Sequence, residues 1–347
     1  MEKTESMTTK ELPGTLVVFL IGQTEMDLFA TTIVEVKTLK SAPSYPDVIP
    51  KQKIIRQERR TVGGMDAELL VKAYLPQAVV VEATVQLDDI LGDGTPEIKR
   101  RLIAECGAVL AEFRCDPEFI EDYSVHCFSG YSGDPEVYLS LHGERIAQFL
   151  KNEASPLDEE EVRKTLDVSL KYGKDDITVI DWDGAFIFDA AGSFQSDIEL
   201  FEIANLQLLR SRSLSSYLDR RLEKTLLMLR GKEPWRLPVL RSREVRKVLR
   251  EIIEIRTQSL LESEVVEHNI KLIGDWYSAR LYSLIAKKLH LESWARNIKE
   301  KLRTLEEVYA MASENFSISY RATIEFAILA GWFVLLILYV GEFILLR

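Results

Sequence analysis

The stretch Asp176–Asp189 reads DITVIDWDGAFIFD and decides the fold class of the first half of the chain. Two short apolar runs, DITVID and AFIFD, flank the sequence Trp182-Asp183-Gly184. An Asp-Gly pair between β-branched and aromatic runs is a strong hairpin signal, because the central residues of a type I′ turn need positive φ angles. The stretch therefore predicts a β-hairpin closed by a tight turn.

Strands and helices alternate on the N-terminal side of this hairpin. Apolar runs predict further strands at Leu16–Ile21, Val79–Gln86 and Tyr123–Phe128. Apolar residues at helical spacing predict helices at Thr95–Arg114, Val137–Leu150 and Pro156–Leu170. The Pro-rich stretch 41–62 is typical of a surface loop or an edge segment. We expect a flexible N-terminus over 1–13 and a mixed α/β domain of the α+β class over 14–190.

Charge separates this domain from the second half of the chain. The net charge of the chain is −11, yet residues 1–194 carry −15 and residues 195–321 carry +5. This reversal predicts a boundary near residue 190 and a helical domain over 195–321. The three cysteines, Cys106, Cys115 and Cys127, form no metal-binding pattern and predict reduced thiols.

A heptad repeat marks the end of the helical domain. Spacings of four and three residues join Leu291, Ala295, Ile298, Leu302, Leu305, Tyr309, Ala312 and Phe316. This pattern predicts a coiled-coil seam and a long helical hairpin, with a rigid stalk that continues unbroken past residue 321. The partner of the seam is either the preceding helix of the same chain or another copy of the chain.

The last apolar stretch, Phe326–Leu346, contains one charged residue, Glu342. Its 21 residues would span about 31 Å, so it predicts a transmembrane helix over 324–346. Trp332 and Tyr339 carry side chains that favour membrane interfaces. We expect a single-pass, tail-anchored protein that contacts lipid through this helix and keeps its body in the cytosol. Glu342 either reaches the far headgroups or acts as an ion site.

The second half resembles the "required for meiotic nuclear division" family of single-pass membrane proteins. The family's aromatic-Gly-aromatic strand is matched by Trp182, Gly184, Phe186 and Phe188, and its pre-membrane motifs by Trp276, Leu281-Tyr282 and Ile324-Glu325. The resemblance covers about residues 175–340. It implies a membrane-anchored protein without established enzymatic activity, whose mitochondrial relatives support protein synthesis at the membrane.

Motifs for catalysis and cofactors are absent from the sequence. It contains no P-loop, no GxGxxG and no HExxH, so we expect no cofactor, catalytic residue or small-molecule substrate. Carboxylates between Asp181 and Glu202 are candidates for a divalent-cation site. The alternative is that these residues form turns and stabilise the N-terminus of a helix. These candidates are Asp181, Asp183, Asp189, Asp197, Glu199 and Glu202.

Residues 210–250 carry 13 basic and four acidic side chains. Arginine dominates, which suits contacts with phosphate groups. The candidates for anion or RNA binding are Arg210, Arg212, Arg220, Arg221, Arg241, Arg243, Arg246, Lys247 and Arg250. RNA, anionic lipid and the acidic domain of the same chain are alternative targets.

These observations favour a non-catalytic, membrane-anchored scaffold or interaction protein that binds a protein partner or forms a homo-oligomer. One alternative is a tethered enzyme or sensor that uses the carboxylates for a divalent cation. A second alternative is an accessory subunit of an ion channel or transporter.

Overall fold

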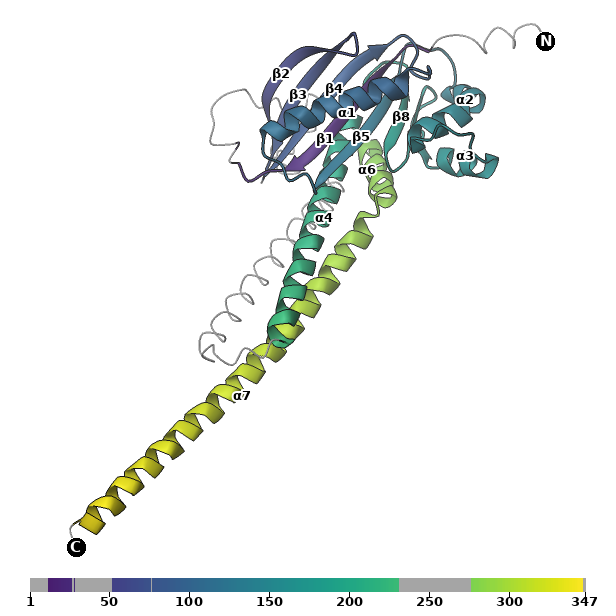
Figure 1. Ribbon diagram of the computed structural model, residues 1–347. Coiled ribbons are helices and arrows are strands. Elements are labelled where there is room, and N and C mark those ends of the chain that lie inside the picture. The colour runs from purple at the N-terminus through teal and green to yellow at the C-terminus, as the bar shows by residue number, and fades with distance from the viewer. Residues whose placement is uncertain (1–11, 27, 29–51, 76, 231–275, 346–347) are drawn as a thin grey trace. The chain divides into compact units, whose positions relative to one another are not determined.

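The structure is a computed structural model that describes residues 12–26, 28, 52–75, 77–230 and 276–345 (Figure 1). The chain divides into two compact units. The first comprises Met1–Ser213 and Glu264–Ala295, and the second comprises Leu214–Ser263 and Arg296–Arg347.

An eight-stranded sheet forms the centre of the first unit. Its order is β2-β3-β4-β1-β5-β8-β7-β6, so the first strand of the chain lies in the middle. The pairs are antiparallel except for β5 with β8. The strands are β1 (Gly14–Gln23), β2 (Gln52–Val62), β3 (Met65–Tyr74), β4 (Ala78–Leu87), β5 (Ile120–Phe128), β6 (Ser169–Leu170), β7 (Asp176–Ile180) and β8 (Gly184–Asp189).

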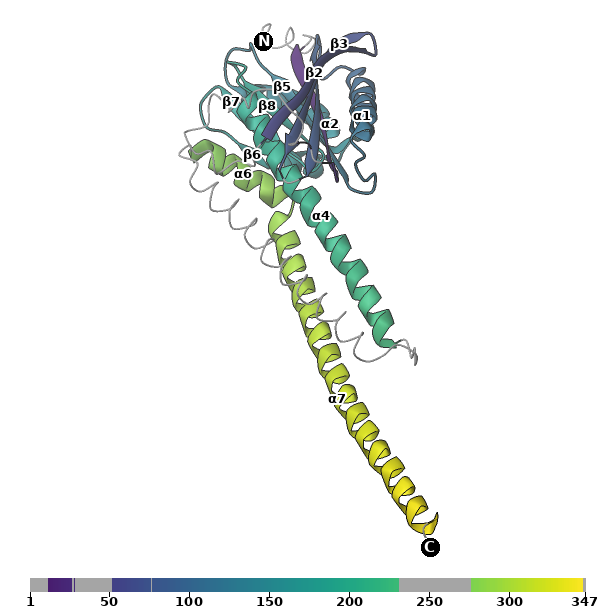
Figure 2. The same cartoon turned by 90° about the vertical axis from the view of Figure 1, so that its left-hand side faces the viewer.

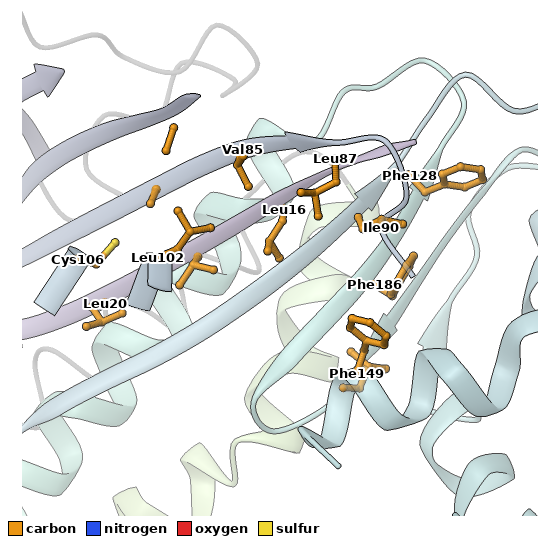
Figure 3. Close-up of a cluster of buried hydrophobic side chains, with 14 of the residues drawn as sticks. Leu16, Leu20, Val85, Leu87, Ile90, Leu102, Cys106, Phe128, Phe149 and Phe186 are labelled. Carbon is orange, nitrogen blue, oxygen red and sulfur yellow. The ribbon is translucent and has the colours of Figure 1, made fainter. Parts of the chain in front are cut away.

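Helices cover both faces of this sheet. Helices α1 (Thr95–Glu112), α2 (Pro135–Lys151) and α3 (Glu159–Leu166) pack on one face. The first turns of α4 (Gln195–Arg230) and α6 (Trp276–Lys288) pack on the other (Figure 2). Because β1 is covered on both sides, all its central residues are apolar. Leu16, Val18 and Leu20 belong to the core beneath α1, shown in Figure 3, whereas Phe19 belongs to the core beneath α4.

The predicted hairpin is present, but its turn is not of type I′. β7 pairs with β8 from Asp176↔Asp189 to Ile180↔Ala185, which confirms the two strands. None of the turn residues 181–184 has a positive φ. Gly184 serves another purpose, because a Cβ at this position would lie 2.8 Å from the carbonyl oxygen of Ser124 on the neighbouring β5. The glycine therefore permits close strand approach rather than a left-handed turn.

One predicted helix end was wrong. The helix predicted over Pro156–Leu170 is shorter, because α3 ends at Leu166 and Ser169–Leu170 form the edge strand β6.

A pair of parallel helices forms the described part of the second unit. The residues of α4 from Leu214 onward pack against α7 (Leu291–Leu345), and the two helices share a small apolar core. This core contains Leu218, Ile298, Leu302, Leu305 and Tyr309, with Leu214, Tyr217 and Leu222 at its margin. The heptad seam therefore pairs with α4 of the same chain. Leu291 packs in the first unit instead, and the side chain of Phe316 lies outside the description.

Helix α7 continues without a break to Leu345. Within the ranges that the structure describes, no helix has both the length and the apolar character to cross a membrane. This finding contradicts the transmembrane helix predicted over 324–346, and with it the single-pass, tail-anchored topology, the lipid contact and the membrane localisation with a cytosolic body. The predicted continuation of the stalk helix past residue 321 is present, since the apolar stretch is the last part of a 55-residue helix whose earlier turns are polar. Trp332 is exposed, and the side chains of Tyr339 and Glu342 lie outside the description.

Candidate functional site

Four charged or polar side chains meet between the sheet and helix α4, and we call them the buried ion cluster: Lys72, Tyr74, Glu82 and Glu202. Lys72 and Tyr74 are two residues apart on β3, so their side chains share one face of the sheet. Lys72 pairs in register with Val80, which places Glu82 of β4 diagonally beside it. The apolar neighbours along both strands hold these positions at the centre of the fold.

Lys72 is the hub of the cluster. Its Nζ lies 2.6 Å from Glu82 Oε2 and 2.8 Å from Glu202 Oε1. The hydroxyl of Tyr74 donates to Glu202 Oε2 at 2.7 Å. All four side chains are buried, and Glu202 is completely inaccessible. One cation thus faces two carboxylates in a place where water does not screen them.

The environment shifts the pKa values of the two carboxyl groups in opposite directions. Burial and the negative charge of Glu82 raise the pKa of Glu202 to about 8, although Lys72 and Tyr74 oppose the rise. Burial opposes the ionisation of Glu82, but the charge and hydrogen bond of Lys72 outweigh it and lower the pKa of Glu82. The same two carboxylates raise the pKa of Lys72 above its ordinary value despite burial. The cluster therefore favours the ionised form of Glu82 beside Lys72 and disfavours the ionised form of Glu202.

Glu199 extends the cluster by one helical turn of α4. Its Oε1 accepts a hydrogen bond from Gln52 Nε2 at 2.5 Å, whereas its buried Oε2 has no hydrogen-bond partner. Burial raises the pKa of Glu199 to about 7. Two carboxyl groups of α4 thus change protonation between neutral and mildly alkaline pH. Such a group of side chains can store protons, but the protonated Lys72 is not a free nucleophile.

A second polar group lies on the opposite face of the sheet, at the start of β5 and β8. Lys99 of α1 donates to Asn152 Oδ1 at 2.5 Å, and Asn152 Nδ2 lies 3.5 Å from Asp183 Oδ2. His126 lies nearby and is completely buried between the rings of Phe149 and Phe186. Neither nitrogen of His126 has a hydrogen-bond partner, and burial lowers its pKa to about 3. His126 is therefore a neutral, apolar-packed imidazole.

The turn of the β7–β8 hairpin carries an ion pair. The buried Asp181 accepts a hydrogen bond from the Trp182 amide at 2.7 Å, and its Oδ1 lies 2.8 Å from Lys288 Nζ of α6. Its other oxygen lies 3.5 Å from Lys151 Nζ of α2. Asp181 thus joins the hairpin turn to a helix on each face of the sheet.

The acidic candidates predicted from sequence do not assemble into one site. Asp181 pairs with lysines, Asp183 faces Asn152, Glu199 and Glu202 are buried against β2 and β3, and Asp197 accepts a hydrogen bond from Tyr277 at 2.9 Å. Asp189 accepts hydrogen bonds from the amides of Ala191 and Ser193. In the described part of the chain, no group of three or more His, Cys, Asp or Glu side chains could hold a metal ion.

The basic candidates divide into described and undescribed residues. Arg212 forms an ion pair with Glu121, and Arg210 donates to the carbonyl of Leu75. Both contacts are made with the acidic domain of the same chain, one of the three predicted targets. Arg220 and Arg221 lie on α4, whereas Arg241, Arg243, Arg246, Lys247 and Arg250 lie outside the described residues.

The residues that carry the family resemblance have separate positions. Phe186 and Phe188 are buried in the core beneath α2, and Leu281 and Tyr282 of α6 are buried against the other face of the sheet. Trp182 and Trp276 are exposed. Glu325 is exposed on α7, and the side chain of Ile324 lies outside the description. Packing of the fold explains the buried members, and the resemblance itself stays a prediction.

Comparison with known proteins places the chain in a family. The family model described as "Uncharacterized protein MJ0711, N-terminal domain" matches residues 14–195, which contain the whole sheet, and the chain belongs to this family. The chain is 23% identical over 319 residues to the uncharacterized protein MJ0711 of Methanocaldococcus jannaschii, an alignment that covers 92% of this chain and 94% of that protein. No solved structure matches the chain.

Proposed function

We propose that the protein is a scaffold that binds a protein partner through its α+β unit and carries this unit on its helical unit. The observation that carries the proposal is the continuity of α4. This 36-residue helix contributes its first residues to the core of the first unit and its last residues to the second.

The N-terminal part of α4 is held in the first unit by apolar and ionic contacts. Phe201 is completely buried and stacks on Tyr123 with a centroid separation of 5.2 Å. Glu202 joins the buried ion cluster beside it. Removing this segment from the sheet would expose aromatic surface and separate buried charges, so a partial detachment is costly.

The C-terminal part of α4 is held in the second unit by polar and apolar contacts. The hydroxyl groups of Thr225 and Tyr309 are hydrogen-bonded at 2.6 Å, and Lys301 Nζ lies 2.6 Å from Asp219 Oδ2. Leu218 and Leu305 are buried in the seam between these polar contacts. Each part of α4 is therefore packed within its own unit, and the helix joins the two units covalently.

Affinity purification of the full-length protein tests this function. We expect a specific protein partner that stays bound after nuclease treatment and binds again when purified. Insertion of Gly-Gly-Pro after Ser213 should interrupt α4 and reduce the recovered partner several-fold while the α+β unit keeps its fold. The matched control is the same insertion after Ala154, in the exposed connection between α2 and α3, which should leave binding unchanged.

Three results would contradict the proposal. They are the absence of any specific partner, loss of all bound material on nuclease treatment, and an α4 insertion without effect on binding. The second result would instead favour RNA as the ligand of the basic residues.

A further inference from the structure

The end of α7 exposes an unusual concentration of apolar side chains, which we call the apolar segment (Ile328–Leu336). Within these nine residues, seven large apolar side chains are 55–70% exposed: Ile328, Leu329, Trp332, Phe333, Val334, Leu335 and Leu336. Exposed apolar surface of this density is typical of an interaction site. The geometry of the helix determines which kind of partner fits it.

Helix α4 is too short to cover the apolar segment. The two helices run parallel, since Asp219 contacts Lys301 and Thr225 contacts Tyr309. α4 ends at Arg230, five residues beyond Thr225, whereas Ile328 lies 19 residues beyond Tyr309. At 1.5 Å per residue, this difference of 14 residues corresponds to about 21 Å. The described part of α4, which buries the upper seam, therefore does not reach the apolar segment.

The exposed side chains form two adjacent seams. Ile328, Trp332 and Leu335 follow one another at spacings of four and three residues. Leu329, Phe333 and Leu336 repeat the same spacings one residue later. With 3.6 residues per turn, the centres of the two seams are about 100° apart around the helix. A dimeric coiled coil needs one seam, whereas two seams let each helix contact two neighbours.

We propose that the apolar segment of α7 assembles with the same segment of other copies of this chain, in a bundle of three or more helices. Each helix contributes one seam to each of two neighbours, so the contacts close on themselves when the chains are identical. Residues 326–341 contain no charged side chain, and like charges therefore do not oppose the approach of identical helices. The inference rests on the scaffold function and names its partner in the helical unit as the chain itself.

The test is the mass of the full-length chain, measured by sedimentation and by light scattering in a mild non-ionic detergent. We expect at least three times the 39.7 kDa of one chain. The double variants Ile328→Ser/Leu335→Ser and Leu329→Ser/Leu336→Ser should each reduce the mass to that of a monomer. Val334 lies outside both seams, so Val334→Ser is the matched control and should keep the wild-type mass.

A monomeric wild-type chain would overturn the inference, whatever the variants do. An equal loss of mass in Val334→Ser would also overturn it, because this result would indicate unspecific apolar association. Circular dichroism and thermal unfolding establish that the variants keep their fold. The scaffold function is tested separately. A seam variant that has become monomeric should still bind the protein partner.

Discussion

Lys72 Nζ lies 2.8 Å from Glu202 Oε1, across the interface between strand β3 and helix α4 and across 130 residues of sequence. The contact closes a group of four buried polar side chains. The contact makes the docking of α4 specific, because the carboxyl group of Glu202 pairs with a cation that lies at one position of the sheet. A shift of the helix by one turn would remove the Glu202 carboxyl group from Lys72 and leave Lys72 with Glu82 alone.

Replacing the hub of the cluster should be severely destabilising. In Lys72→Met, Glu82 and Glu202 face each other without a cation, and we expect the free energy of unfolding to fall by about 3–5 kcal/mol. Chemical denaturation measures this loss. Lys164→Met removes an exposed ion pair with Glu160 and should cost at most about 1 kcal/mol. Similar losses in both variants would show that the buried cluster stabilises the fold no more than an exposed ion pair does.

Raising the pH should weaken the fold through Glu202. Its pKa is about 8 in the folded protein, against an ordinary value of 4.5, so the folded state binds the extra proton. Stability from this group is complete below about pH 4.5 and is lost as the pH rises to about 8. We expect denaturation curves of Glu202→Gln to depend less on pH in this window than wild-type curves. Glu160→Gln is the exposed control. If Glu202→Gln left the pH dependence of unfolding unchanged, this pH dependence would not come from Glu202.

Lowering the pH should weaken the fold through His126. The pKa of its imidazole is about 3 in the folded protein, against an ordinary value of 6.5, so the unfolded chain binds the extra proton. Stability is therefore lost as the pH falls from about 6.5 toward 3. His126→Leu should flatten this acid limb, measured as melting temperature against pH. His142→Leu changes a partly exposed histidine and should not flatten it to the same extent.

The seam of the helical unit should depend on its buried leucine. Leu305 is completely buried between α4 and α7, and Leu305→Ala should reduce the free energy of unfolding by about 2–5 kcal/mol. Met311 lies on the same helix with 57% of its side chain exposed, so Met311→Ala should change stability by less than about 0.5 kcal/mol. Thermal unfolding followed by circular dichroism compares the two. Equal effects would mean that α4 does not bury the seam.

Local patterns in the sequence predicted much of the sheet domain. The runs at Leu16–Ile21 and Val79–Gln86 became β1 and β4 because apolar side chains are needed on both faces of a covered sheet. The strand β2 was harder to predict, since Arg56, Arg59 and Arg60 give an edge strand the composition of a loop. The end of α7 misled the prediction, because an apolar run of 21 residues at the end of a long helix was interpreted as a membrane span.

The buried ion cluster was missed almost entirely. Only Glu202 was a candidate, and it was assigned to a metal site together with carboxylates that lie in other parts of the fold. One signal was present in the sequence: Lys72 and Glu82 interrupt strands that are otherwise apolar. A buried charge needs an opposite charge, but the sequence did not show which of many carboxylates on α4 would supply it. That choice depends on how α4 docks, which is a property of the tertiary structure.

The central place of β1 in the sheet has a consequence for biosynthesis. β1 leaves the ribosome first, but one of its neighbours, β5, is complete only at Phe128, and β5 in turn waits for β8 near Asp189. The apolar strand β1 therefore lacks a partner on one edge while more than a hundred residues are translated. Pairings this distant in sequence form slowly, and nascent chains of this length expose aggregation-prone edges. The chain should therefore benefit from a chaperone that shields β1 until translation has passed the β7–β8 hairpin.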